Sequence, residues 1–342
     1  MARFRFQGDT TTSLWCGYRA AFQLSGFLET MTIDDIVALS RTQTVESGLV
    51  AGLWLSRSAV ALHTPSGSML PVFGFASDFD AELSRRKSIF ELIEHLSFHP
   101  YKPILSDRTV VLRRSNGRWR NVVDCSPDSL LLGASNFGEV LHGNGCAVHT
   151  SLEQAAGHAE NEVLERHYCC EMWYNRRLRP RLLDIDVRLH QRFRNSVKFY
   201  EIGHLETRHL VISIVDADEI DFFCMGASLK PSREAAIHHC LGEAATLLDD
   251  VLLLRAGYTA TAAARSKILS LRDRKLSQDR KQYFSSLLSV EGSYSSSFNS
   301  VSAIYAFRVL DDIFAARAST VGLLTPRRFH NDWNDVPIMP LF

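Results

Sequence analysis

The sequence predicts an α+β fold in which mixed β-sheets carry helices on their outside. The chain has 342 residues, of which 46% are hydrophobic and 22% charged, and this composition is typical of one large globular domain or two packed subdomains. One pattern also occurs three times, at residues 74–95, 145–167 and 226–248: a glycine, a strand end of small residues, capping residues and then a helix. Three unequally spaced units are too few for a solenoid and predict three related arms of one site.

Each repeat carries local signals for a strand followed by a helix. In the second, Thr150 and Glu153 form the T-x-x-E pattern of a capping box, and in the third, Pro231 fits the first turn of a helix. The first and third helices each have an apolar face for the core. These faces are Ile89, Leu92, Ile93 and Leu96, and Ile237, Leu241, Ala244 and Leu248.

Glutamates recur at a fixed distance from the glycine of each repeat. A Glu follows the glycine by 17 residues in all three, and these residues are Glu91, Glu162 and Glu243. The first two repeats add a second Glu three residues later, Glu94 and Glu165, where the third has Thr246. The repetition indicates that the glutamates share one role.

Helix geometry suggests what that role is. Residues three or four positions apart share a helix face, so Glu162 and Glu165 lie about 60° apart with Arg166 between them. On one helix this pattern is also typical of a solvated charged face. Five carboxylates on three equivalent helices, however, would repel one another unless cations lay between them. We therefore predict a shared site for Mg²⁺ and, through the metal, for the phosphates of a nucleotide.

Charge and targeting signals exclude several functional classes. The 38 Lys and Arg residues balance 38 Asp and Glu residues, so no overall field attracts the chain to nucleic acid or to an anionic membrane. The sequence has neither the apolar core of a signal peptide nor an apolar stretch long enough to span a bilayer. Seven cysteines without a C-x-x-C spacing suit a reducing compartment. We expect a cytoplasmic protein that binds neither nucleic acid nor membrane.

The three repeats resemble the motifs of the YcaO family. Ser88, Glu91, Glu94 and His95 resemble its S-x-x-E-x-x-E-R signature. The stretch "GHAENEVLERH" resembles its second E-x-x-E-R helix, and "GASLKPSREAAIHHCLGEAA" its later alanine-rich helix with one Glu. The resemblance covers about residues 70–342 and implies a YcaO-like fold in which ATP and Mg²⁺ bind between three Glu-bearing helices. The chain has no P-loop motif G-x-x-x-x-G-K-S/T.

The resemblance also implies the residues of the site. The implied nucleotide contacts are Ser88, Glu91, His95, Asn144, Gln154, Glu162, Arg166, His239 and Glu243. The implied metal ligands are Glu91, Glu94, Glu162, Glu165 and Glu243. His95 and His239 stand where the family usually has arginine, and a histidine is neutral much of the time near pH 7. We expect these two positions to alter nucleotide affinity.

By the same resemblance the chain is an azoline-forming cyclodehydratase of modified-peptide biosynthesis. Such enzymes use ATP to activate a peptide amide oxygen and cyclise Cys, Ser or Thr of a ribosomal precursor peptide to thiazoline or oxazoline. The implied partners are the precursor peptide, an E1-like leader-binding protein and, in some systems, an FMN-dependent dehydrogenase, in a hetero-oligomeric complex. Two alternatives stay open: a thioamide- or amidine-forming enzyme, and a non-catalytic scaffold subunit.

The end of the chain is expected to take part in catalysis. Cyclising family members often end in a P-x-P-x-P tail whose terminal carboxylate lies in the active site, and this chain ends "DVPIMPLF". The resemblance implies a degenerate tail in which Pro337 and Pro340 restrict the backbone and the Phe342 carboxylate acts as a base. The alternative is an ordinary disordered end.

Domain boundaries and two minor sites complete the expectations. We expect an N-terminal extension without an assigned role at residues 1–60 and a YcaO-like ATP-binding domain at residues 61–342. The extension is too short for a leader-binding module, which implies a separate partner chain.

His95 and His99, at helical spacing, are weak candidates for zinc. The arginines within residues 176–194 favour partner docking or a solvated face over nucleic-acid binding.

Overall fold

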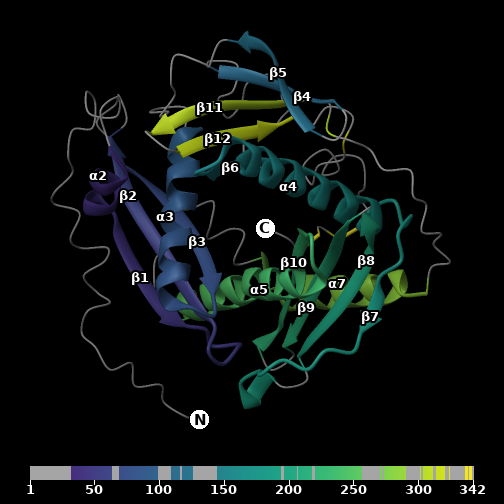
Figure 1. The fold of residues 1–342 in the computed structure, drawn as a ribbon. Coiled ribbons are helices and arrows are strands. Elements are labelled where there is room, and N and C mark those ends of the chain that lie inside the picture. The colour runs from purple at the N-terminus through teal and green to yellow at the C-terminus, as the bar shows by residue number, and fades with distance from the viewer. Residues whose placement is uncertain are drawn as a thin grey trace.

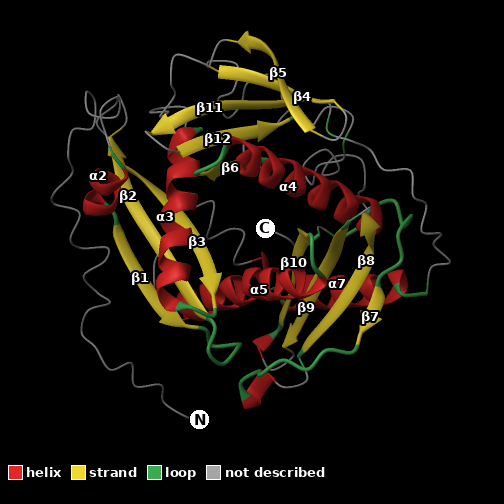
Figure 2. Cartoon of the chain, in the orientation of Figure 1, coloured by secondary structure: helices red, strands yellow, loops and turns green. Residues whose placement is uncertain are grey.

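In its described residues the computed structural model forms three sheets and three helices of 17 residues or more (Figures 1 and 2). It describes residues 32–63, 69–98, 109–115, 118–125, 145–193, 196–205, 207–217, 220–255, 270–271, 273–289, 301, 303–310, 313–319, 323, 336–337 and 339–340. The α+β class is confirmed. Every strand pairing in these ranges is antiparallel, so the sheets are more uniform than the mixed sheets that we predicted.

Each sheet has one helix that directly follows one of its edge strands. The first sheet has the order β1-β2-β3, with β1 (Arg41–Glu46), β2 (Trp54–His63) and β3 (Met69–Asp78). The second has the order β5-β4-β11-β12-β6, with β5 (Arg118–Cys125), β4 (Thr109–Ser115), β11 (Ile304–Leu310), β12 (Ile313–Ala318) and β6 (Cys146–His149). The third has the order β10-β9-β8-β7, with β10 (Phe222–Lys230), β9 (Arg208–Ala217), β8 (Val197–Leu205) and β7 (Arg181–Leu183).

The helices that follow β3, β6 and β10 are the three that the repeats predicted. They are α3 (Ala81–Ser97), α4 (Leu152–Trp173) and α5 (Arg233–Arg255). The shorter helices are α2 (Ile33–Leu39), α7 (Arg274–Leu287) and a 3₁₀ turn at Gln191–Phe193. None of the helices in the described part of the chain is long and apolar enough to cross a membrane.

The helix starts differ from two of our local predictions. The N-cap of α4 is Ser151, without a side-chain capping bond, so the capping box at Thr150 and Glu153 is wrong. Pro231 precedes α5, and the Ser232 hydroxyl accepts a hydrogen bond from the Ala235 N–H at 3.1 Å. Both shifts are one or two residues, which is the usual uncertainty of helix ends read from sequence.

The three repeats pack in a cyclic order around the centre of the molecule (Figure 1). Each helix packs on its own preceding strand: α3 on β3, α4 on β6 and α5 on β10. Each also packs on the edge strand of the next repeat: α3 on β6, α4 on β10 and α5 on β3. Because each helix packs on two sheets in this way, one face of each of the three helices is directed toward a common centre.

The glycines that begin the repeats allow this packing. A Cβ atom on Gly74 would lie 2.1 Å from the Ser88 carbonyl oxygen, and one on Gly226 would lie 2.0 Å from the Cys240 carbonyl oxygen. Gly145 has a φ of +72°, and a Cβ there would lie 2.2 Å from the side chain of Val163. Each strand therefore approaches its own helix more closely than any side chain would permit.

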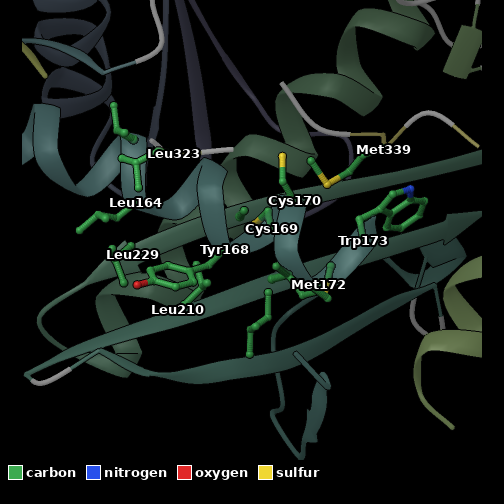
Figure 3. Packing of buried hydrophobic residues seen from close by; sticks show 14 of the residues in the cluster. Leu164, Tyr168, Cys169, Cys170, Met172, Trp173, Leu210, Leu229, Leu323 and Met339 are labelled. Carbon is green, nitrogen blue, oxygen red and sulfur yellow. The ribbon is translucent and has the colours of Figure 1, made fainter. Parts of the chain in front are cut away.

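The helix faces that border the sheets form the hydrophobic cores. The predicted core residues of α3 and α5 are all buried, and they lie in two separate clusters. The largest cluster surrounds α4, and in Figure 3 Tyr168 of this helix lies beside Leu210 and Leu229 of the β9–β10 hairpin. Helix α4 is therefore the central helix of the fold and is covered on most sides.

The predicted domain boundary near residue 60 lies inside a described strand. This strand is β2, which pairs with β1 on one side and with β3 along its full length on the other. Ile36 of α2 is buried in the same cluster as the apolar face of α3. From Thr32 onward, the described part of the expected extension therefore belongs to the first sheet and its core.

Candidate functional site

The first glutamate of each repeat binds the free edge of the strand before it. The Ala227 N–H donates to Glu243 Oε2 at 3.0 Å. In the same way Glu91 accepts a hydrogen bond from the Phe75 backbone and Glu162 from the Gly145 backbone. Edge strands carry N–H groups that no neighbouring strand pairs, and a glutamate 17 residues after the glycine reaches one of these groups when the helix folds back.

The second glutamate of the second repeat reaches the next repeat. Glu165 Oε2 accepts a hydrogen bond of 3.0 Å from the Leu229 N–H on β10. Two residues away on the same strand edge, the Ala227 N–H binds Glu243. Glutamates of α4 and α5 are therefore fixed side by side along one strand, although they are far apart in the sequence.

The five carboxylates share one electrostatic environment. Burial, together with a smaller effect of the charge of Glu162, raises the pKa of Glu91 to about 8. Burial also raises the pKa of Glu162 to about 7 and that of Glu243 to about 8, with Glu165 as the main like-charge neighbour of both. Burial and the charges of Glu162 and Glu91 raise the pKa of Glu94. The predicted cluster thus exists as a set of carboxylates that oppose one another's ionisation.

Arg166 balances part of this charge. Its side chain is buried, and its Nε lies 4.0 Å from Glu165 Oε1. Burial alone would lower its pKa, but the carboxylates of Glu165, Glu243 and Glu162 raise it, so the guanidinium stays charged. One arginine cannot neutralise five carboxylates, and the site keeps an excess of acidic groups.

Two predicted contact residues already have partners in the protein. Ser88 is fully buried; its hydroxyl shares a hydrogen bond of 2.8 Å with Ser58 and donates to the Arg85 carbonyl at 2.8 Å. His95 bonds the Phe73 carbonyl through Nδ1, and burial lowers the pKa of its ring. In this geometry both side chains fix α3 against the first sheet.

Of the other predicted residues, the structure describes His239 and Gln154. His239 Nδ1 lies 3.8 Å from Glu243 Oε1, and Gln154 is exposed in the first turn of α4. Asn144, His99 and Phe342 lie outside the described residues. Sequence reasoning missed Lys230, whose charge lowers the pKa of Glu162, Glu165 and Glu243. A signal was available, because Lys230 follows the glycine of its repeat by only four residues.

The segment from Val336 to Pro340 is docked. The Trp173 Nε1–H donates to the Pro337 carbonyl at 2.7 Å, and the Met339 N–H donates to the Tyr174 hydroxyl at 3.3 Å. The Met225 N–H donates to the Pro340 carbonyl at 3.0 Å, and Met339 packs in the core beside α4 (Figure 3). A disordered end is therefore wrong for these residues.

This docking places Pro340 on the edge of β10, the strand whose backbone N–H groups bind Glu243 and Glu165. Met225, Ala227 and Leu229 are alternate residues of β10, and their N–H groups bind the Pro340 carbonyl, Glu243 and Glu165 in turn. At about 3.3 Å per residue, Pro340 lies about 7 Å along the strand from the N–H that holds Glu243.

The arginine-rich segment after α4 is partly anchored to the protein. Arg181 forms an ion pair with the buried Glu201, and Arg177 lies 3.6 Å from Glu171. The Arg176 guanidinium lies 5.0 Å from the centre of the Tyr283 ring. These contacts give the segment a structural role beside the docking role that we expected.

The donor groups fit Mg²⁺ together with phosphate. Within the described ranges, no three side chains of His, Cys, Asp or Glu lie close enough to hold a metal ion by themselves. Mg²⁺ does not need such a cage, since it usually takes one or two protein carboxylates and fills its other positions with water and phosphate oxygens. Paired glutamates with raised pKa values match this coordination, because a divalent cation would replace their protons.

Comparison with known proteins supports the same fold. A family model described as YcaO cyclodehydratase, ATP- and Mg²⁺-binding, matches residues 138–313. YcaO from Methanopyrus kandleri bound with AMPPCP and Mg²⁺ is similar in structure, with a TM-score of 0.57 and 14% identity over 88% of this chain and 89% of that chain. The E. coli microcin synthetase McbBCD complex with pro-MccB17 bound gives a TM-score of 0.56 and 13% identity, over 81% and 86% of the two chains.

A third structure extends the comparison to a larger protein. A heterocyclase in complex with substrate and cofactor has a TM-score of 0.55 and 13% identity, over 91% of this chain but 56% of that chain. A search of curated proteins by sequence gave no match. At these identities the structural similarities establish the fold.

Proposed function

The chain belongs to the YcaO family, and from this membership and its site we propose that it activates a peptide amide oxygen with ATP and Mg²⁺. The reaction would cyclise Cys, Ser or Thr of a ribosomal precursor peptide to thiazoline or oxazoline. The observation that carries the proposal is the convergence of glutamates from three helices, with like charges that raise one another's pKa. A protein without a cation to bind gains nothing from such a cluster.

The proposed metal ligands are the five glutamates of the repeats: Glu91, Glu94, Glu162, Glu165 and Glu243. Glu165 and Glu243 each bind β10 through Oε2, while Oε1 of Glu165 lies 4.0 Å from Arg166 Nε and Oε1 of Glu243 lies 3.8 Å from His239 Nδ1. These distances are longer than a hydrogen bond, so each Oε1 can still coordinate a ligand in the centre. Arg166 and His239 lie beside these carboxylates, and together with Gln154 of α4 they are the proposed nucleotide contacts. Ser88 and His95 would act indirectly, by fixing α3.

The chain's own groups would orient the reactants. When bound, ATP supplies the phosphoryl group with which the amide oxygen, otherwise a poor leaving group, departs as phosphate. Arg166 is a charged donor fixed in a site with little water, where it can stabilise negative charge on the transferring group. The three helices hold their carboxylates on rigid elements, which supports the positioning on which phosphoryl transfer depends.

The docked segment from Pro337 to Pro340 is proposed to border the peptide substrate. Its anchoring to β10 places it beside the strand edge that holds Glu243. Prolines at Pro337 and Pro340 reduce the entropy that this segment loses on docking. A base for the amide or nucleophile proton would come from this side of the site, where we expected the Phe342 carboxylate.

We further propose that the enzyme works in a hetero-oligomeric complex with an E1-like leader-binding protein. One structurally similar protein is the McbBCD complex with pro-MccB17 bound, which joins several subunits and a precursor. An FMN-dependent dehydrogenase would be needed only where azolines are oxidised to azoles.

Co-expression with a candidate precursor peptide and neighbouring genes tests the function. Cyclodehydration predicts the loss of one water per ring in the peptide's mass spectrum, and this loss should disappear with Glu162→Gln. Replacement of oxygen by sulfur would indicate the thioamide alternative. An unchanged peptide, together with no peptide-dependent ATP hydrolysis, would favour a non-catalytic subunit, an alternative that Thr246 in place of a sixth glutamate keeps open.

A further inference from the structure

A layer of basic residues lies one helical turn from the glutamates. The residue 13 positions after the glycine of each repeat is Lys87, His158 or His239, and each precedes a glutamate of the cluster by four residues, so that it shares the glutamate's helix face. The residue four positions after each glycine, at the strand end, is Asp78, His149 or Lys230. Each repeat thus presents a pair of residues beside the glutamates, one from a strand and one from a helix.

The three pairs differ in whether a carboxylate neutralises their basic residue. In the first repeat, Lys87 Nζ lies 2.5 Å from Asp78 Oδ2, so the helix lysine is neutralised by its own strand. In the second, the rings of His149 and His158 lie 5.5 Å apart and meet edge to face. In the third, the strand residue is Lys230 and the helix residue is His239, so this pair has no carboxylate.

Lys230 has no ion-pair partner among the described residues, whereas Lys87 is paired with Asp78. Lys230 is half-buried, and its side chain has neither an ion pair nor a hydrogen bond with any residue in the described ranges. Its charge nevertheless acts on Glu162, Glu165 and Glu243, and on the rings of His158 and His239. The backbone N–H of the preceding residue, Leu229, binds Glu165, so Lys230 is fixed beside the cluster on an edge strand.

Two observations indicate an anion at this position. Burial of a lysine without a partner is costly, and such a side chain is normally paired when its ligand is present. Two rings of the layer, His158 and His239, stand next to it, and a neutral imidazole can donate one N–H to an anion. An anion that touches Lys230 would lie beside the carboxylates on which the charge of Lys230 acts, Glu162, Glu165 and Glu243.

We propose that Lys230 binds the terminal phosphates of the nucleotide and supplies the positive charge for which the third repeat has only His239. This inference rests on the proposed function, since it names a contact residue of the same site. Lys87 does not share the role, because Asp78 already neutralises it. Lysine suits the position because its ammonium is a compact point charge that binds phosphate oxygens without fixed geometry.

Calorimetric titration of the intact chain with Mg²⁺ and either ATP, AMP or inorganic triphosphate tests the proposal. Lys230→Ala should weaken ATP and triphosphate binding about tenfold to a hundredfold, the effect of losing one charged hydrogen bond, and should weaken AMP binding less than about threefold. Lys230→Arg should restore most of the affinity. Lys87→Ala, the matched control, should change ATP affinity less than about threefold.

The outcomes separate the inference from the function. Equal loss of ATP and AMP binding in Lys230→Ala, or an effect of Lys87→Ala as large as that of Lys230→Ala, would give Lys230 a merely structural role and overturn the inference. Unchanged ATP affinity in Lys230→Ala would overturn it while leaving the proposed function intact. If the wild-type chain bound triphosphate through Lys230 but did not bind ATP, Lys230 would be a phosphate contact, and both the nucleotide in the inference and the proposed function would be wrong. If the wild type binds neither, both are wrong.

Discussion

The backbone N–H of Ala227 donates a hydrogen bond of 3.0 Å to the Glu243 carboxylate. Equivalent bonds hold Glu91 to Phe75 and Glu162 to Gly145, so the proposed metal ligands are also the groups that satisfy three strand edges. Each glutamate therefore has a structural role through one oxygen and a proposed binding role through the other, and different substitutions can separate the two.

The first prediction compares two variants at Glu243. Glu243→Gln keeps an oxygen that can accept from Ala227 but removes the charge, so we expect unchanged or higher stability without metal and at least tenfold weaker Mg²⁺ binding, about 1.4 kcal/mol. Glu243→Ala leaves a buried N–H without an acceptor and should cost about 1–3 kcal/mol of the free energy of unfolding. Urea unfolding in EDTA and Mg²⁺ titration measure the two effects. Equal stability of the two variants would contradict the structural role.

The sequence predicted the parts of the site that depend on local periodicity. The glycine-to-glutamate spacing, the apolar faces of α3 and α5 and the convergence of the glutamates could all be inferred, because helix geometry fixes which residues share a face. The sequence also indicated on which side of each helix the glutamates lie, because each helix has one apolar face and its glutamates border that face. Charge repulsion then suggested a cation.

The remainder depends on contacts between distant segments. The bond between Trp173 and the Pro337 carbonyl joins residues 164 positions apart, and no local pattern indicates it. The burial of Ser88 depends on Ser58 of β2, which a helix motif cannot reveal. That α3, α4 and α5 each bridge to the next sheet was likewise not predictable, since it follows from the order of strands in three separate sheets.

The second prediction concerns pH. The pKa of Glu91 and of Glu243 is raised from 4.5 to about 8 in the folded chain, so the folded state binds more protons than the unfolded state between these values. Stability without metal should therefore fall as pH rises through this window. His158, with a pKa lowered from 6.5 to about 4 by partial desolvation, acts in the opposite direction at lower pH, so the test belongs above about pH 7.

Urea unfolding in EDTA from about pH 7 to about pH 9 measures this slope. The double variant Glu91→Gln and Glu243→Gln should reduce this slope, because it removes two of the carboxylates whose pKa values are raised. Saturating Mg²⁺ should also flatten it, since the metal binds the ionised carboxylates, and apparent Mg²⁺ affinity should rise with pH over the same range. A wild-type stability that increases with pH in EDTA would refute the assignment.

The third prediction concerns the docked segment. Tyr174→Phe removes the hydroxyl that accepts from the Met339 N–H and keeps the ring, so hydrogen-exchange protection of residues 336–340 should fall by about 1–3 kcal/mol at most. Tyr200→Phe is the control, since Tyr200 packs its ring on Phe284 in the same cluster and does not contact the segment through its hydroxyl. A similar loss of protection in both variants would show a general effect on the core.

The last prediction compares two glycines. Gly226→Ala would place a Cβ 2.0 Å from the Cys240 carbonyl oxygen, so β10 and α5 must separate, and this change moves Glu243 away from the Ala227 N–H. Overpacking of this kind typically costs about 1–3 kcal/mol, and we expect Mg²⁺ binding to weaken together with stability. Gly157→Ala is the control, because a Cβ there would meet nothing within 4 Å and alanine stabilises a helix interior by about 1 kcal/mol relative to glycine. The two substitutions therefore have opposite expected signs in the same thermal unfolding experiment. A Gly226→Ala variant as stable as the wild type would contradict this prediction. The close contact between β10 and α5 would then not explain the 17-residue spacing from glycine to glutamate.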